Sequence, residues 1–223
     1  YNSLDHGIDG GLAIAYYDAA KGDLKCAMYK VDDDVVSWDV ALVDSLGDVG
    51  LNPSLDHDPA GNPAIAYYDL TNRNLKYAAY RKGSWVIETV DEGANVGQFS
   101  SLQHDSEGRP AISYYDRANG DLKYALRNEG GWRVTIVDSA GRVGLYNCLR
   151  YDPEGMPVIS YQDGGKSELK CAVLYDDEWH SVIVDDGVDP AFPDDPEKKA
   201  EVGYKGSLVY NAEGRPAVAY YDA

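Results

Sequence analysis

Residues 101–125 have the sequence SLQHDSEGRPAISYYDRANGDLKYA, and residues 54–78 have a close variant of the same motif, SLDHDPAGNPAIAYYDLTNRNLKYA. Four tryptophans accompany these words at intervals of 47 residues: Trp38, Trp85, Trp132 and Trp179. Self-similarity at a fixed period is the signature of a repeat architecture. The chain divides into five copies, at residues 1–48, 49–95, 96–142, 143–201 and 202–223, and the last copy ends after its second segment.

Each full copy reads as four short strands. Gly-x-Pro turns such as Gly108-Arg109-Pro110 precede the PAISYYD segment, and no segment has a helical period over ten residues or more. A repeat of this length with four antiparallel strands is typical of a β-propeller blade. We therefore expect an all-β fold over residues 1–223, a single β-propeller with five blade positions. The fifth blade is expected to be incomplete in this chain, its edge covered by further residues or by a strand from a partner.

The composition excludes several classes of partner. The chain has 38 acidic and 20 basic residues, a net charge of -18, which would repel nucleic acid or an anionic membrane surface. No apolar run reaches the length of a membrane-spanning helix. The three cysteines have neither the number nor the spacing of a disulfide framework or a zinc site, and their redox state stays open.

With the words SLxxDxxGxPAIAYYDxxNGDLKYA, the chain resembles secreted or surface-displayed bacterial and archaeal β-propeller repeat proteins, most of them without assigned activity. The resemblance implies a propeller fold and an extracellular or cell-surface location. It does not imply one activity, because propellers host lectins, hydrolases, lyases and scaffolds.

Residues that recur in every copy are interpreted as structural. His6, His57 and His104 share a position that holds Tyr151 and Tyr210 in the later copies, so we expect an amphipathic ring to pack there without a shared metal ion. The aspartate that ends each second strand is expected to cap the following turn. These aspartates are Asp18, Asp69, Asp116, Asp163 and Asp222.

The candidate site is predicted at positions whose residue type differs between copies, because a packing requirement shared by all copies would not produce that variation. They enter the first strand of each copy, on the face with the connections between blades, and their aromatic and amide groups suit a sugar or a peptide. The predicted ligand-binding residues are Asn2, Gln98, Phe99, Tyr146, Asn147, Arg150, Tyr204 and Lys205. No catalytic residue, metal ligand or cofactor is assigned. Calcium at Asp189, Asp194 and Asp195, within the insertion of the fourth copy, is kept as an alternative to an exposed loop.

Three functions remain in competition. The leading hypothesis is a non-enzymatic, extracellular, lectin-like binding or scaffold module for a glycan or protein partner. The alternatives are a glycan-active hydrolase or lyase with carboxylates near the axis, and a structural segment of a larger assembly. An enzyme would require acidic residues that break the repeat, whereas most carboxylates here follow it.

Overall fold

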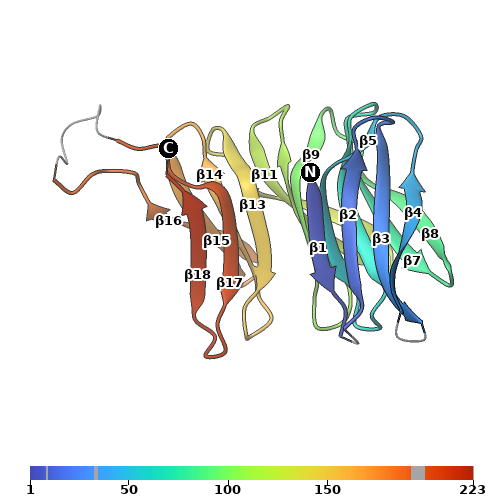
Figure 1. Ribbon diagram of the computed structural model, residues 1–223. Coiled ribbons are helices and arrows are strands. Elements are labelled where there is room, and N and C mark those ends of the chain that lie inside the picture. Colours follow the sequence, from blue (N-terminus) through green and yellow to red (C-terminus); the bar gives the residue numbers. More distant parts are fainter. Residues whose placement is uncertain (9, 33–34, 192–198, 223) are drawn as a thin grey trace. The chain divides into compact units, whose positions relative to one another are not determined.

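The computed structural model describes residues 1–8, 10–32, 35–191 and 199–222, and every regular element in these ranges is a β-strand (Figure 1). The all-β prediction is confirmed. No helix that could span a membrane occurs in these ranges.

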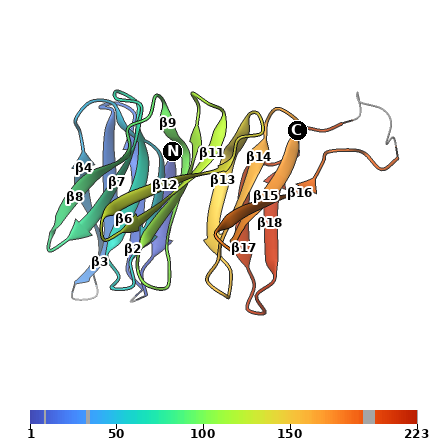
Figure 2. The same ribbon diagram turned by 180° about the vertical axis from the view of Figure 1, so that it is seen from behind.

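The strands form antiparallel sheets in sequence order, one sheet within each copy of the repeat (Figure 2). The first sheet contains β1 (Asn2–His6), β2 (Leu12–Asp18), β3 (Asp23–Asp32) and β4 (Val35–Asp44). The second contains β5 (Val49–His57), β6 (Pro63–Asp69), β7 (Asn74–Arg81) and β8 (Ser84–Asp91). The third contains β9 (Val96–His104), β10 (Pro110–Asp116), β11 (Asp121–Asn128) and β12 (Gly131–Asp138). The fourth contains β13 (Val143–Tyr151), β14 (Pro157–Asp163), β15 (Glu168–Tyr175) and β16 (Glu178–Asp185). β17 (Tyr204–Tyr210) and β18 (Pro216–Tyr221) pair as a two-stranded sheet.

Burial differs with the place of a strand in its sheet. All seven residues of β6, β10 and β14 are buried, while most residues of the edge strands β4 and β16 are exposed. A strand buried on both faces has no need of polar alternation, which explains the continuous apolar words PAIAYYD and PVISYQD. The second, third and fourth sheets are therefore covered by protein on both faces at these strands.

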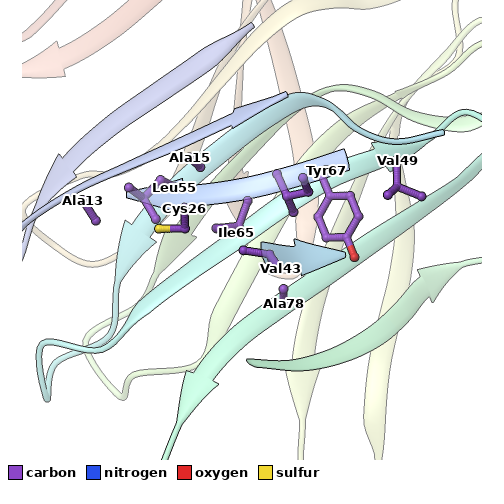
Figure 3. Packing of buried hydrophobic residues seen from close by; sticks show 10 residues of the cluster. Ala13, Ala15, Cys26, Val43, Val49, Leu55, Ile65, Tyr67 and Ala78 are labelled. Atoms are coloured by element: carbon purple, nitrogen blue, oxygen red, sulfur yellow. The ribbon is translucent and has the colours of Figure 1, made fainter. Parts of the chain in front are cut away.

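The chain forms two compact units, Tyr1–Ile112 with Ala125–Arg133, and Ser113–Tyr124 with Val134–Ala223. In the first unit, small side chains of the first sheet, Ala13, Ala15 and Cys26, pack against Ile65 and Tyr67 of the second (Figure 3). Alanines at this interface allow the two sheets to approach closely.

A second cluster forms within the other unit. Cys148, Val158 and Leu208 join the fourth sheet to β17 there, and the Leu208 amide lies 3.4 Å from Cys148 Sγ. The cysteines thus act as small core residues.

Glycine is required where β5 and β13 begin. A Cβ on Gly50 would lie 2.7 Å from Leu24 Cβ, and a Cβ on Gly144 would lie 2.8 Å from Leu122 Cβ. Their φ angles of 101° and 98° also lie in the region that side chains disfavour. These glycines let each first strand enter directly beside the preceding sheet.

Candidate functional site

The recurring aspartates cap turns, as the sequence predicts. Asp69 Oδ1 accepts the Asn72 amide at 2.8 Å, and Asp163 Oδ1 accepts the Gly165 amide at 3.0 Å. Asp116 Oδ1 accepts the Ala118 amide at 3.0 Å in the same way. The caps belong to the repeat and give no chemistry of their own.

The histidines of the first strands pair with carboxylates of the preceding copy. His57 Nδ1 lies 2.8 Å from Asp5 Oδ2, and His104 Nδ1 lies 2.8 Å from Asp56 Oδ2. The His57 and His104 side chains are 7% and 5% exposed, so these two have equivalent packed environments, whereas His6 is exposed. The predicted packing is confirmed for His57 and His104 and wrong for His6, which lies in the first copy and has no preceding sheet of the repeat to pair with. The repeat gave no sign of the aspartate partners.

A Tyr-Asp-Lys network links successive sheets. Asp44 Oδ2 accepts the Tyr67 hydroxyl at 2.7 Å and Lys76 Nζ at 2.8 Å. Burial acts to raise the pKa of Asp44, but these two hydrogen bonds outweigh it and hold the pKa below its usual value. Burial and the Asp44 charge together raise the pKa of the Tyr67 phenol far above its usual range. The network therefore keeps a buried carboxylate charged.

The fourth sheet contains the same Tyr-Asp-Lys network but differs from the second sheet in the contacts of Asp163 and Glu168. Tyr161 and Lys170 donate to Asp138 Oδ2 at 2.7 and 2.5 Å. Asp163 lies directly opposite Glu168 where β14 and β15 pair, and the two residues are only 1% and 8% exposed. Within the described residues, Asp163 Oδ2 and Glu168 Oε2 are buried without a hydrogen-bond partner. The acidic pair itself follows the repeat, since Asp18 lies opposite Asp23 in the first sheet. What changes in the fourth copy is that Asp163 Oδ2 and Glu168 Oε2 have no hydrogen-bond partner among the described residues.

A group of polar and aromatic side chains lies beside this departure in the same unit. We call it the Tyr204 cluster: Tyr146, Gln162, Glu201, Tyr204 and Tyr221. The rings of Tyr146 and Tyr204 are 5.4 Å apart, and those of Tyr204 and Tyr221 are 6.5 Å apart. The Tyr204 hydroxyl donates to Glu201 Oε2, and Gln162 Nε2 donates to the Val202 carbonyl at 2.9 Å. The hydrogen bond to Glu201, followed by burial, raises the pKa of Tyr204.

The backbone helps to present this cluster. Tyr146 and Lys205 both have φ of 49°, unusual for residues with a side chain, and the pairing of β17 with β18 shifts register between Tyr204 and Ser207. Asn52 and Phe99 adopt the same conformation at the matching positions of the other unit, with φ of 49° and 55°. The bulge is thus a property of the repeat, and the side chain it carries changes from copy to copy.

The structure brings together some of the predicted site residues. Tyr146 and Tyr204 lie in contact, and Lys205 is the exposed residue that follows. Asn147 is buried and holds the bulge, since its side chain accepts from Ser113 Oγ at 2.5 Å and donates to the Gly144 carbonyl at 3.0 Å. Arg150 Nη1 donates to the Leu149 carbonyl at 2.7 Å.

The other predicted residues lie in the first unit. Gln98 Nε2 is 3.3 Å from Asn95 Oδ1, the Phe99 amide is 3.5 Å from Asn52 Oδ1, and Asn2 is exposed. Sequence reasoning missed Gln162, Glu201 and Tyr221 as members of the cluster. The available signal was Gln162, which interrupts the Tyr-Tyr pairs of the other copies.

The described residues contain no group of three or more His, Cys, Asp or Glu side chains arranged to hold a metal ion. Of the residues considered for calcium, Asp194 and Asp195 lie outside the described residues. Asp189 Oδ1 accepts the Ala191 amide at 2.8 Å, as a turn-capping aspartate does.

Comparison with known proteins gives a fold. No protein-family model and no curated protein matches the sequence. Among solved structures, a protein of unknown function from Dyadobacter fermentans aligns over 99% of this chain and 74% of its own, with 12% identity and a TM-score of 0.65. An ulvan lyase of polysaccharide lyase family PL25 aligns over 100% of this chain and 66% of its own, with 12% identity and a TM-score of 0.61.

A β-1,3-galactosidase of family GH43 aligns over 100% of this chain and 94% of its own, with 9% identity and a TM-score of 0.56. At these identities the likeness establishes a propeller-like all-β fold and nothing finer. The chain spans 66% of the length of the ulvan lyase, whose solved complex contains a glucuronate and sulfated rhamnose oligosaccharide.

These comparisons correct the leading functional hypothesis. The expectation of a non-enzymatic binding or scaffold module is wrong, because the named structures that share the fold are glycan-cleaving enzymes. The alternative hypothesis, a glycan-active hydrolase or lyase, fits them better. The sequence hides the difference between the copies, because Asp163 matches the recurring aspartates in sequence and differs from them only in its contacts.

Proposed function

We propose that this chain is the propeller domain of a polysaccharide-cleaving enzyme, a lyase or a hydrolase, and that the Tyr204 cluster is its site. The observation that carries the proposal is the phenol–carboxylate pair of Tyr204 and Glu201, with two further tyrosine rings, those of Tyr146 and Tyr221, beside it. The propeller-like fold shared with glycan-cleaving enzymes supports it.

The cluster has the parts that sugar recognition requires. Tyrosine offers an apolar ring face and a polar hydroxyl at little cost in conformational entropy. Tyr221 is 63% exposed and Lys205 is exposed beside it, so solvent reaches this group of residues. A sugar ring can therefore pack on the phenyl faces while its hydroxyls bond the exposed Glu201 or Lys205.

The Tyr204–Glu201 pair supplies a route for proton transfer. Tyrosine and glutamate both act as general acids or bases when they are held within hydrogen-bonding distance of a reacting group. Glu201 lowers the tendency of Tyr204 to ionise, so Tyr204 is held as the proton donor. In an elimination the carboxylate takes the proton next to a uronate carboxyl group, whereas hydrolysis requires a second carboxylate on the other side of the sugar.

The proposal includes a finer arrangement of the sheets. We take the five sheets as successive blades around an axis, with β1, β5, β9, β13 and β17 nearest to it. A polymeric glycan is an extracellular substrate, so a secreted or cell-surface location belongs to the same proposal.

Cleavage assays with purified protein test the proposal. The probes are polysaccharides with and without uronate residues, followed by release of reducing ends and by the ultraviolet absorbance of unsaturated uronates, which only a lyase produces. Tyr204→Phe and Glu201→Gln are expected to lower kcat by about a hundredfold or more, the usual effect of losing an acid–base group.

Tyr175→Phe is the matched control, because Tyr175 is 56% exposed at one end of β15, where it pairs with Glu178, whereas the other end of the strand lies opposite Asp163. Its activity should equal that of the unchanged protein. Full activity of Tyr204→Phe would refute the assignment of the site, and failure of the unchanged protein to cleave any glycan would refute the function.

A further inference from the structure

The first compact unit contains a cavity of about 660 Å³ at the turns that end β9 and β11. Its lining includes Arg81, Arg109 and Arg127 together with Glu107 and Glu129. Three of the nine arginines of a chain with net charge -18 therefore surround one cavity. The three arginines outnumber the two glutamates of the lining, in a molecule whose net charge would otherwise repel an anion.

Arg127, one of the lining residues, occupies a position that holds tyrosine in the first two copies. The matching residues of the first two copies, Tyr29 and Tyr80, place their rings 5.5 and 5.3 Å from Trp38 and Trp85 of their own sheets. Arginine at this position in the third copy has no such ring. Trp132 packs instead on Tyr77, with ring centroids 5.2 Å apart, and it donates Nε1 to Glu88 at 3.2 Å.

The guanidinium of Arg127 is only partly used by the protein. Arg127 Nη2 lies 3.1 Å from Glu88 Oε1, but Arg127 Nε is buried and has no hydrogen-bond partner among the described residues. A buried donor without an acceptor costs free energy, and a turn of the Arg127 side chain that brings Nε to the oxygen of a bound anion removes that cost.

Arg81 is the second available donor. It lies at the end of β7, exposed, and forms no ion pair with any described residue. Arg109 differs, since its Nε lies 2.7 Å from Asp105 and its Nη1 lies 3.2 Å from Glu107. Arg109 therefore fixes the wall of the cavity, and Arg81 and Arg127 are left to bind a ligand. Arginine suits carboxylate and sulfate because its planar donors match their paired oxygens.

We propose that this cavity is a second glycan subsite, one that binds the carboxylate or sulfate group of an acidic sugar. The choice of a sugar rests on the proposed function, whereas the choice of an anion rests on the arginines alone. Within the first unit the cavity lies at the opposite end of β9 from the bulge at Phe99, so it is separate from the positions that the repeat uses to present aromatic side chains.

Titration calorimetry tests the subsite without reference to cleavage. The probes are a galacturonate trisaccharide, a sulfated trisaccharide, an uncharged trisaccharide of the same length and inorganic sulfate, each added to the Tyr204→Phe variant so that nothing is turned over. At least one acidic trisaccharide should bind more tightly than the uncharged one and than inorganic sulfate, with an affinity that falls as ionic strength rises.

Arg81→Gln and Arg127→Gln, each added to that background, should weaken binding of the acidic trisaccharide by about tenfold, the usual range for a charge-assisted hydrogen bond. Arg215→Gln is the matched control, since Arg215 occupies the same turn position as Arg109, pairs with Glu213 at 3.4 Å and is 79% exposed. It should bind like the parent. Arg81 has no structural ion pair to lose, so its variant separates a binding role from a folding role.

Equal binding by Arg81→Gln, Arg127→Gln and the parent would overturn the subsite. So would equal affinity for charged and uncharged trisaccharides, or binding of inorganic sulfate alone. If the protein cleaves no glycan but these variants still lose the acidic trisaccharide, the proposed function fails and the subsite stands.

Discussion

The second and fourth sheets share a tyrosine, an aspartate and a lysine at matching positions but differ in what surrounds the aspartate. In the second sheet, Asp69 Oδ2 accepts Asn72 Nδ2 at 2.9 Å and has Lys76 Nζ at 3.4 Å. In the fourth sheet the corresponding Asp163 has Lys166 in place of the asparagine, and Lys170 binds Asp138.

Asp163 Oδ2 is left without a partner among the described residues, opposite the buried Glu168. The second sheet therefore satisfies every member of its network, while the fourth keeps two carboxylates that stability alone does not favour. Repetition marks the scaffold of this molecule, and local failure of repetition marks the places to search for function.

The largest effect on stability is expected from a substitution in the Tyr67–Asp44–Lys76 network, in which every polar group has a partner. Asp44→Ala would leave the Tyr67 hydroxyl and Lys76 without the acceptor that now lies 2.7 and 2.8 Å from them. Removing one partner of a buried ion pair costs about 3 kcal/mol or more. Chemical denaturation should show this loss, and a loss below about 1 kcal/mol would mean that the network is not a source of stability.

Acid should act on the same networks. Burial acts to raise the pKa of Asp138, but hydrogen bonds from Lys170 and Tyr161 lower it below the ordinary 3.8. A carboxyl with a lowered folded pKa contributes stability above its unfolded pKa and loses it as the pH falls through the folded value. Stability should therefore hold down to about pH 5 and fall below about pH 4.

Asp138→Asn should make the free energy of unfolding fall less steeply below about pH 4. The exposed Asp39, paired with Lys30 at 2.7 Å, serves as control, and Asp39→Asn should keep the slope of the unchanged protein. The measurement is the free energy of unfolding as a function of pH. Identical acid limbs in all three proteins would contradict the assignment.

A matched pair of substitutions sharpens the comparison between the two sheets. Asp69→Asn should destabilise the protein by about 1 to 3 kcal/mol, because it loses a charged acceptor for Lys76 and Asn72. Asp163→Asn should be neutral or stabilising, because Oδ1 can still accept the turn amides while the oxygen without a partner is replaced by a donor opposite Glu168. Equal destabilisation by both substitutions would show that Asp163 has a partner equivalent to Lys76.

The smallest effect on stability is expected at the two glycines that lie where the first strands of the second unit begin, Gly144 and Gly203. Gly144→Ala should cost about 1 kcal/mol more than Gly203→Ala, although both residues have φ near 90 to 100°. A Cβ on Gly144 would lie 2.8 Å from Leu122 Cβ, whereas one on Gly203 would have its nearest neighbours at 3.4 Å. Thermal or chemical denaturation of the two variants measures the difference, and a greater loss for Gly203→Ala would contradict the packing described here.

The sequence predicts what the repeat determines. The strands, the turn caps and the packed His57 and His104 follow from patterns with a period of 47 residues. Pairings across copies, such as Asp56 with His104, are missed because they join residues 48 positions apart, beyond the reach of any local pattern.

The candidate site is predicted only in part for a similar reason. Tyr146 and Tyr204 stand out because they vary between copies, but Glu201 lies in an insertion that has no counterpart. The lost partner of Asp163 is visible only as a missing hydrogen bond. Functional sites of this kind have to be sought in the exceptions to a repeat.

Product masses test the central claim most directly. Purified protein is incubated with a panel of neutral and acidic polysaccharides, and the released oligosaccharides are weighed by mass spectrometry. The account predicts products from at least one polysaccharide, each heavier by one water if the bond is hydrolysed or carrying one double bond if it is eliminated. Polysaccharides that all remain intact after prolonged incubation with folded protein would contradict it.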